Sequence, residues 1–72
     1  MILARIDRLG LGHLGDVRPV GQGVSEMRIH QGPGYRIYIA QRGSECVILL
    51  AGGDKSTQRD DIQKAIRMAR QL

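Results

Sequence analysis

The chain has 72 residues, enough for one domain whose small core stabilises the fold only marginally. It has no Phe, no Trp and only two Tyr, so the core must be built from aliphatic side chains and Met. A single Cys excludes an internal disulfide and fits a reducing compartment. The longest apolar run, CVILLA, is too short to span a membrane, and the charged start is unlike a signal peptide, so we expect a cytoplasmic protein.

The balance of charges favours an anionic partner. Lys and Arg number 11 against 7 Asp and Glu, which gives a net charge of +4, and most of the cations are arginine. The planar guanidinium group donates several hydrogen bonds to phosphate, and nucleic acid is the common phosphate-rich partner of basic domains. A soluble domain that is merely rich in arginine would have the same composition, so charge alone leaves both interpretations open.

The first segment, residues 2–9, has apolar residues at Ile2, Leu3, Ile6 and Leu9, a helical spacing that predicts a short helix. No residue at its start is a helix cap. The glycines of the following GLGHLGD fit the spacing of a dinucleotide-binding loop, but here they come after a helix and before an extended segment. We therefore interpret GLGHLGD as a helix end and a loop.

Residues 16–30 predict two strands joined by a GQG turn. The proline in the first of these strands restricts it to an edge position or to an extended loop. The second, VSEMRIH, alternates between two faces. We expect Met27 and Ile29 to face the core, so that Arg28 and His30 face outward.

Residues 35–41 follow a QGPG turn and predict another strand. Alternation places Arg36 and Tyr38 on the face opposite Ile37, and Tyr35 is expected at the edge of the strand, half buried. The nearly continuous apolar run CVILLAGG predicts a central strand that is covered on both faces for part of its length.

The last segment, DKSTQRDDIQKAIRMARQL, predicts a helix with Ser56 or Thr57 as its N-cap. The expected buried stripe is Ile62, Ala65, Ile66, Ala69 and Leu72. Basic residues recur at helical spacing on another face: Lys64, Arg67 and Arg70. That face is either solvated or in contact with RNA. The whole pattern predicts an α+β domain, 1–72, in which a sheet of three to four antiparallel strands is packed by an N-terminal and a C-terminal helix.

Metal and nucleophile chemistry find little support in the sequence. The His, Cys and Asp residues lack the spacing of metal ligands, so we expect no metal and no cofactor. Cys46 lies in an apolar strand and is expected to be a small buried hydrophobe. Asp60 and Asp61 are adjacent on a helix and point in different directions, so they do not form a carboxylate pair for acid–base catalysis.

The polar candidates that remain are mainly cationic. Arg28 and Arg36 lie on neighbouring strands with Tyr38 on the same face, His30 is near the turn, and Lys55 follows the central strand. Antiparallel pairing would bring these groups into one patch that can bind a phosphate and stabilise extra charge on it. This set suits RNA cleavage by the substrate's own 2′-hydroxyl, because the RNA supplies the nucleophile. The protein then needs only to orient the 2′-oxygen, neutralise the charge of the phosphorane and protonate the leaving oxygen.

A plainer interpretation of the same residues stays open. Arg28 and Arg36 would then be solvated, or paired with a carboxylate such as Glu26 or Glu45. Such pairs on strands are common and need no substrate.

Two stretches carry a resemblance to a known family: GDVRPVGQGVSEMRIHQGPGYRIYIAQRG, followed by VILLAGGDKSTQRDDIQKAIRMA. They resemble the RelE/HigB superfamily of type II toxins, in particular its subgroup of addiction-module killer proteins. The resemblance implies a small sheet packed by helices that acts as a ribonuclease on mRNA at the ribosome, without a metal. It also implies a helix-turn-helix antitoxin as partner, with operator DNA bound only through that antitoxin.

The resemblance also implies roles for individual residues. Arg36 matches the phosphate-binding arginine of the superfamily, and Arg28 falls where members place basic residues that face the RNA. Lys55 follows the last strand, where members carry a cation. Members differ in their acid and base, so His30 and Tyr38 are candidates for proton transfer. The basic helix face with Lys64 and Arg67 is an additional candidate for RNA binding.

One departure from the family pattern leads to a second hypothesis. Members usually begin with a strand and a helical hairpin, whereas this chain starts with ILARIDRL, inside the second helix, and so lacks the N-terminal strand and first helix. We expect an exposed sheet edge and a smaller core as a result. The alternative function is therefore a shortened, non-catalytic module that binds an antitoxin or nucleic acid.

Overall fold

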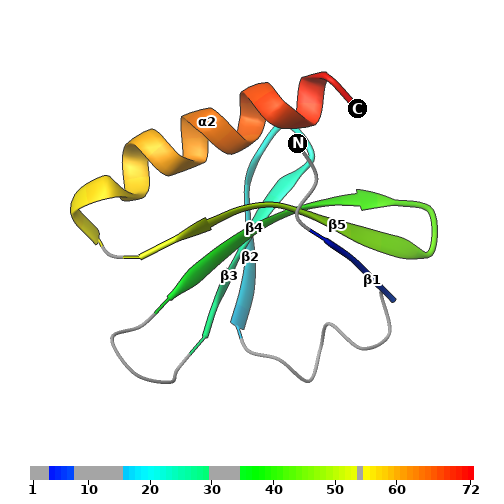
Figure 1. The fold of residues 1–72 in the computed structure, drawn as a ribbon, viewed down its shortest axis with the longest axis horizontal. Helices are drawn as coiled ribbons and strands as arrows, with labels where there is room; N and C mark the ends of the chain where they lie inside the picture. Colours follow the sequence, from blue (N-terminus) through cyan, green and yellow to red (C-terminus); the bar gives the residue numbers. More distant parts are fainter. Residues whose placement is uncertain (1–3, 8–15, 30–34, 54) are drawn as a thin grey trace.

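The computed structural model describes residues 4–7, 16–29, 35–53 and 55–72, and one α-helix lies across one face of an antiparallel sheet (Figure 1). The elements are β1 (Ala4–Asp7), β2 (Asp16–Gly21), β3 (Val24–Arg28), β4 (Arg36–Arg42), β5 (Glu45–Gly52), the 3₁₀ turn η1 (Lys55–Thr57) and α2 (Gln58–Arg70). The predicted small α+β class is therefore confirmed, with five strands among the described residues in place of the expected three or four.

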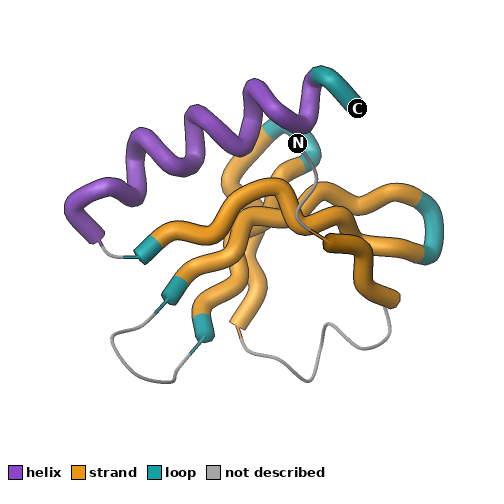
Figure 2. The backbone as a smooth tube through the Cα atoms, viewed as in Figure 1, coloured by secondary structure: helices purple, strands orange, loops and turns teal. Residues whose placement is uncertain are grey.

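The five strands pair in the order β1-β5-β4-β3-β2, all antiparallel. The apolar run in β5 lies between two neighbours, as its lack of alternation predicted. The proline-containing strand β2 is at an edge, which agrees with the missing backbone donor of Pro19. Figure 2 shows the β2–β3 and β4–β5 hairpins, with the former turning at Gln22, whose φ is 52°, between two glycines of positive φ.

A helix was predicted over residues 2–9. The structure describes residues 4–7 of this segment, and there the prediction is wrong. Ala4–Asp7 forms β1, paired with Glu45–Ile48 of β5. A helix this short is unstable without packing, whereas the open edge of β5 provides backbone partners for an extended segment. The expected N-terminal helix is thus replaced by a strand, and that strand occupies the sheet edge that was expected to be exposed.

The main core lies between α2 and the sheet face beneath it. Its buried members are Val24, Tyr38, Ala40, Val47, Leu49, Ala65, Ile66 and Ala69. The predicted helix stripe is confirmed at Ala65, Ile66 and Ala69, while Ile62 is partly buried and Leu72 is 45% exposed. Thr57 is the N-cap residue by position, although its side chain forms no capping hydrogen bond.

Strand β3 is buried on both of its faces, and this corrects one prediction. Met27 is buried and Arg28 is exposed, as expected. Val24 and Glu26, which share the face of Arg28, were expected to point outward, but α2 covers them. Alternation correctly sorted the side chains into two faces, but it did not indicate that a helix lies on the second one.

Candidate functional site

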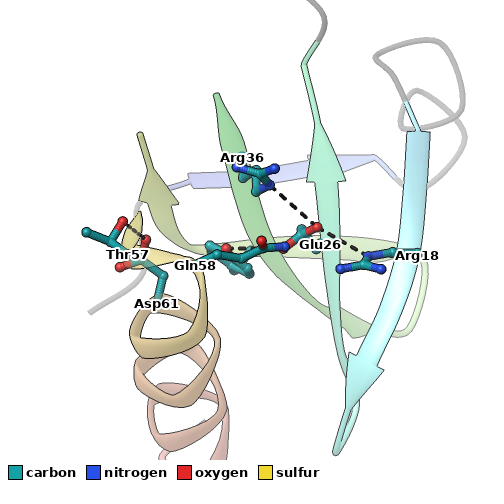
Figure 3. Close-up of polar contacts among 7 residues, drawn as sticks. Arg18, Glu26, Arg36, Thr57, Gln58 and Asp61 are labelled. Carbon is teal, nitrogen blue, oxygen red and sulfur yellow. Dashed lines mark hydrogen bonds and ion pairs between the residues drawn. The ribbon is translucent and has the colours of Figure 1, made fainter. Parts of the chain in front are cut away.

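A buried carboxylate lies at the centre of the polar end of the helix–sheet interface. Glu26, in the middle of β3, is only 2% exposed. The register places Arg18 of β2 on one side of it and Tyr38 of β4 on the other. Figure 3 shows Glu26 between Arg18 and Arg36, with Gln58 reaching it from the first turn of α2. Side chains from three other elements, β2, β4 and α2, therefore meet the acidic side chain of β3.

The contacts of Glu26 are directional. Arg18 Nε donates to its Oε1 over 3.3 Å. Its Oε2 accepts hydrogen bonds from the hydroxyl of Tyr38 over 3.2 Å and from Nε2 of Gln58 over 2.9 Å. Arg36 Nε lies 3.8 Å from Oε1, close enough for an ion pair but too far for a hydrogen bond.

These contacts keep Glu26 ionised at neutral pH. Burial acts to raise its pKa, because a low-dielectric surrounding disfavours the charged form. Two hydrogen bonds, from Gln58 and Tyr38, and two positive charges, of Arg18 and Arg36, act in the opposite direction. Together they outweigh the effect of burial, and the pKa of Glu26 falls below its ordinary value of 4.5. The site thus contains a fixed negative charge that holds the cations around it.

The same surroundings act in the opposite sense on Tyr38, which is fully buried. Burial, and next the charge and hydrogen bond of Glu26, raise the pKa of the Tyr38 phenol to about 12. The hydroxyl therefore keeps its proton and donates it in a hydrogen bond to Glu26. Tyr38 therefore holds the Glu26 carboxylate in place through this hydrogen bond.

The arginine pair proposed from the sequence lies together on adjacent strands. Arg28 and Arg36 are register partners on β3 and β4, so their side chains leave the same face of the sheet. Arg28 is exposed, whereas Arg36 is only 5% exposed. The Nε atom of Arg36 is buried and has no hydrogen-bond partner among the described residues. Because this Nε faces Glu26, an anion that approaches beside Arg28 would be met by the terminal nitrogens of the Arg36 guanidinium.

The other sequence candidates are distributed around this pair. Lys55 is exposed in η1 and borders a groove of about 350 Å³ together with Arg18 and Gln58. Lys64 and Arg67 are exposed on α2 and do not line that groove. His30 lies outside the described residues. Cys46 is buried and free, as predicted.

The start of α2 is positioned by a close approach to β5. A Cβ atom added to Gly52 would lie 2.5 Å from Oδ2 of Asp61 and 3.3 Å from Cε2 of Tyr38. Asp61 Oδ2 also accepts a hydrogen bond from the Thr57 hydroxyl over 2.8 Å. Because Gly52 has no side chain, the first turn of α2 can lie close to β5 and bring Gln58 to Glu26.

Sequence reasoning had named Glu26 only as a possible partner of an arginine and had not anticipated its central place. It missed Arg18, and it noted Gln58 only as part of the family motif, without a chemical role. Gln58 is 32 residues from Glu26, and no local pattern indicates such a contact. One signal was available, because Glu26 shares its alternating strand face with Arg28, and opposite charges on one face can pair. Among the described residues, no group of three or more His, Cys, Asp and Glu could hold a metal ion.

Comparison with known proteins gives one family and one close relative. The model of the family described as "Phage derived protein Gp49-like (DUF891)" matches residues 2–72. An uncharacterized protein of Haemophilus influenzae is 49% identical over 71 residues, which cover 99% of this chain and 72% of that relative. No solved structure matches.

In the described part of the chain, no helix is long and apolar enough to cross a membrane.

Proposed function

Because the chain belongs to the family of phage-derived Gp49-like proteins, which is associated with toxin–antitoxin modules, we propose that it is the toxin component of a type II toxin–antitoxin system. Its activity would be that of the RelE/HigB toxins it resembles, the endonucleolytic cleavage of mRNA on the ribosome. A helix-turn-helix antitoxin would neutralise it, and operator DNA would be bound only through that antitoxin.

The observation that carries the proposal is the Arg28–Arg36 pair beside a fixed carboxylate. Two guanidinium groups leave the same face of adjacent strands, one exposed and one buried with its Nε in an ion pair with Glu26. A phosphate seated between them would have charge-assisted donors on two sides. Glu26 restrains Arg36 before the substrate arrives, so little reorganisation is needed when negative charge develops.

In the proposed reaction the 2′-oxygen of the RNA attacks the adjacent phosphorus and forms a new P–O bond. The bond to the 5′-oxygen breaks, and the RNA is left with a 2′,3′-cyclic phosphate. Arg28 and Arg36, with Lys55, stabilise the additional charge on the phosphorane. One proton leaves the 2′-hydroxyl and another must reach the departing 5′-oxygen.

Two residues are candidates for proton transfer, Tyr38 and His30. The pKa of Tyr38 is about 12 and its hydroxyl is already used by Glu26, which makes it a poor proton donor at neutral pH. Of the two candidates from the sequence, we therefore favour His30, because an imidazole is the side chain that most readily both donates and accepts a proton near neutrality.

The second candidate function is a non-catalytic module that binds an antitoxin or nucleic acid. It is favoured by the inward position of Arg36 and Tyr38, which are 5% and 0% exposed. In that case Arg36, Tyr38 and Glu26 would form a structural network, and only the exposed cations would contact a partner. Cleavage of translated mRNA separates the two functions, because only the first predicts it.

The test uses Arg28→Ala, Arg36→Ala and a control, Arg42→Ala, at the opposite end of β4. Growth arrest on induction and cleavage of translated mRNA are measured for each variant. Loss of a phosphate-stabilising arginine should slow cleavage on the order of 10²-fold or more, while the control keeps the parent rate. Arg28 is exposed, so its variant should remain folded even if Arg36→Ala does not. Parent-like cleavage by both site variants would contradict the proposal.

A further inference from the structure

We infer that the groove between β2 and the start of α2 binds the sugar–phosphate backbone of single-stranded RNA, on one side of the phosphate that is cleaved. This inference rests on the proposed ribonuclease function and names a part of its substrate site. Three cations border the groove: Arg18, Lys55 and Arg59. Arg18 and Arg59 were not among the residues that the sequence indicated.

The composition of the groove suits a polyanion with ribose rings. Its volume is about 350 Å³, and its remaining lining residues are Gln58, Ile62 and Gln63. None of the described residues that line it is acidic. Cations attract the phosphates, the amides can hydrogen-bond ribose hydroxyls, and the partly buried Ile62 offers an apolar contact to the sugar.

The cations of the groove are available to a ligand. The Arg18 side chain is 64% exposed although its Nε bonds Glu26, so the outer end of the guanidinium faces solvent. Lys55 and Arg59 are both exposed, and neither forms a salt bridge within the described ranges.

Arg18 links the groove to the proposed cleavage site, because it lines a hollow at each of them. Arg18 also borders a second hollow of about 170 Å³, whose other lining residues are Asp16, Glu26 and Arg28. A strand with its scissile phosphate at Arg28 can therefore pass Arg18 and enter the groove. The carboxylates of Asp16 and Glu26 can accept hydrogen bonds from ribose hydroxyls and base amino groups, donors that the ionised side chains of an acidic peptide lack. RNA is thus the occupant that the two hollows favour together.

The experiment compares three double variants that each remove two positive charges. R18Q/R59Q changes the groove, and glutamine at position 18 retains an amide donor for Glu26. R42Q/R70Q is the matched control, because Arg42 likewise makes one internal hydrogen bond, to the carbonyl oxygen of Ala69, and Arg70 is likewise an exposed residue of α2. K64Q/R67Q tests the rival surface on α2.

The probe is a single-stranded RNA of about ten nucleotides, a length within the usual range of single-strand sites. Its riboses are 2′-O-methylated so that it cannot be cleaved, and fluorescence anisotropy gives Kd over a series of salt concentrations. Each lost phosphate contact should reduce the slope of log K against log salt by about 0.7, so R18Q/R59Q should reduce it by about 1.4. R42Q/R70Q should leave the slope unchanged. R59Q alone, which does not touch Glu26, should reduce the slope by about 0.7.

An unchanged slope in R18Q/R59Q and R59Q, or an equal reduction in K64Q/R67Q, would overturn the groove assignment. Selective loss of binding to a poly-glutamate peptide, with RNA binding intact, would also overturn it and would mark the groove as a protein site. The outcome is separable from the main proposal. If the groove variants bind RNA normally while Arg28→Ala loses cleavage, only the groove fails. If the parent neither binds nor cleaves RNA, the ribonuclease function itself fails.

Discussion

The two ends of α2 meet the same sheet face through different kinds of interface. Toward its C-terminus the helix lays Ala65, Ile66 and Ala69 on an apolar surface. At its N-terminus Gln58 donates a hydrogen bond to the buried carboxylate of Glu26, and Asp61 lies close to Gly52 of β5. Apolar burial is non-directional and strongly stabilising, whereas a buried ionic network must recover a large desolvation cost through its hydrogen bonds.

This difference indicates a division of roles along one helix. The apolar end fixes the helix on the sheet, and that attachment lets the polar end hold charged groups that add little net stability. A small domain with an aliphatic core can carry a cationic site in this way, because the stabilising contacts and the reactive groups occupy separate parts of the interface. The predictions below test that separation, from the largest expected effect to the smallest.

The largest effect on stability is expected at the apolar end. Ile66→Ala removes a side chain that is 6% exposed, and it should lower the free energy of unfolding by about 3 kcal/mol through lost burial and a residual cavity. Urea denaturation followed by circular dichroism measures the change. The folded fraction of this variant should bind RNA like the parent, since Ile66 does not line the groove. A loss below about 1 kcal/mol would show that the apolar end is not the main anchor.

At the polar end, Glu26→Gln should cost about 2 kcal/mol, because Arg36 remains buried without its counter-charge. The pH dependence gives a sharper test. The pKa of Glu26 lies below 4.5 in the folded state, so its contribution to stability is complete above that value and is lost as the pH falls through the folded pKa.

Comparison of the parent with Glu26→Gln isolates this contribution from that of the other carboxylates. The difference in unfolding free energy should be constant between about pH 6 and 7, more than one unit above the ordinary glutamate pKa of 4.5, and should shrink as the pH falls through that value and below it. A difference that stays constant through the acid range would mean that the Glu26 charge does not stabilise the fold.

Tyr38→Phe tests whether the phenol supports the site or takes part in the chemistry. It removes the hydrogen bond to Glu26 and should cost about 1 kcal/mol. In the parent, the raised pKa of Tyr38, about 12, gives a stabilisation that is present below the ordinary value of 10 and is lost as the pH rises toward 12. The variant should lack this alkaline loss and should still cleave RNA. A cleavage defect as large as that of Arg28→Ala would instead identify Tyr38 as the proton donor.

The same contrast explains how much the sequence could predict. Alternation in strands gave the shared face of Arg28, Arg36 and Tyr38, and helical spacing gave the stripe at Ala65 and Ala69, because both patterns are local. Sorting by local period therefore identified Ala65, Ile66 and Ala69 correctly, although Leu72 is 45% exposed.

The polar end could not be derived in this way. Glu26 is buried because a helix from 32 residues further along covers it, and Arg18 reaches it only through the pairing of β2 with β3. Ala4–Asp7 likewise became a strand because β5 offered an edge, although its own spacing suggested a helix. In each case a tertiary partner outweighed the local signal, and the partner is not visible in a single sequence.

The smallest effect is expected where polar contacts border the apolar end. Arg70 donates from Nε and a terminal nitrogen to the side-chain oxygen of Gln22, over 3.1 and 2.6 Å, yet both residues are exposed. Water can replace such contacts, so Arg70→Ala should change the free energy of unfolding by no more than about 0.5 kcal/mol. Gln22→Gly, which relieves a positive φ but loses the same contact, is the companion variant. If Arg70→Ala proved as costly as Glu26→Gln, the surface contact at Gln22 would be a second anchor of α2, and stability would not be confined to the apolar core.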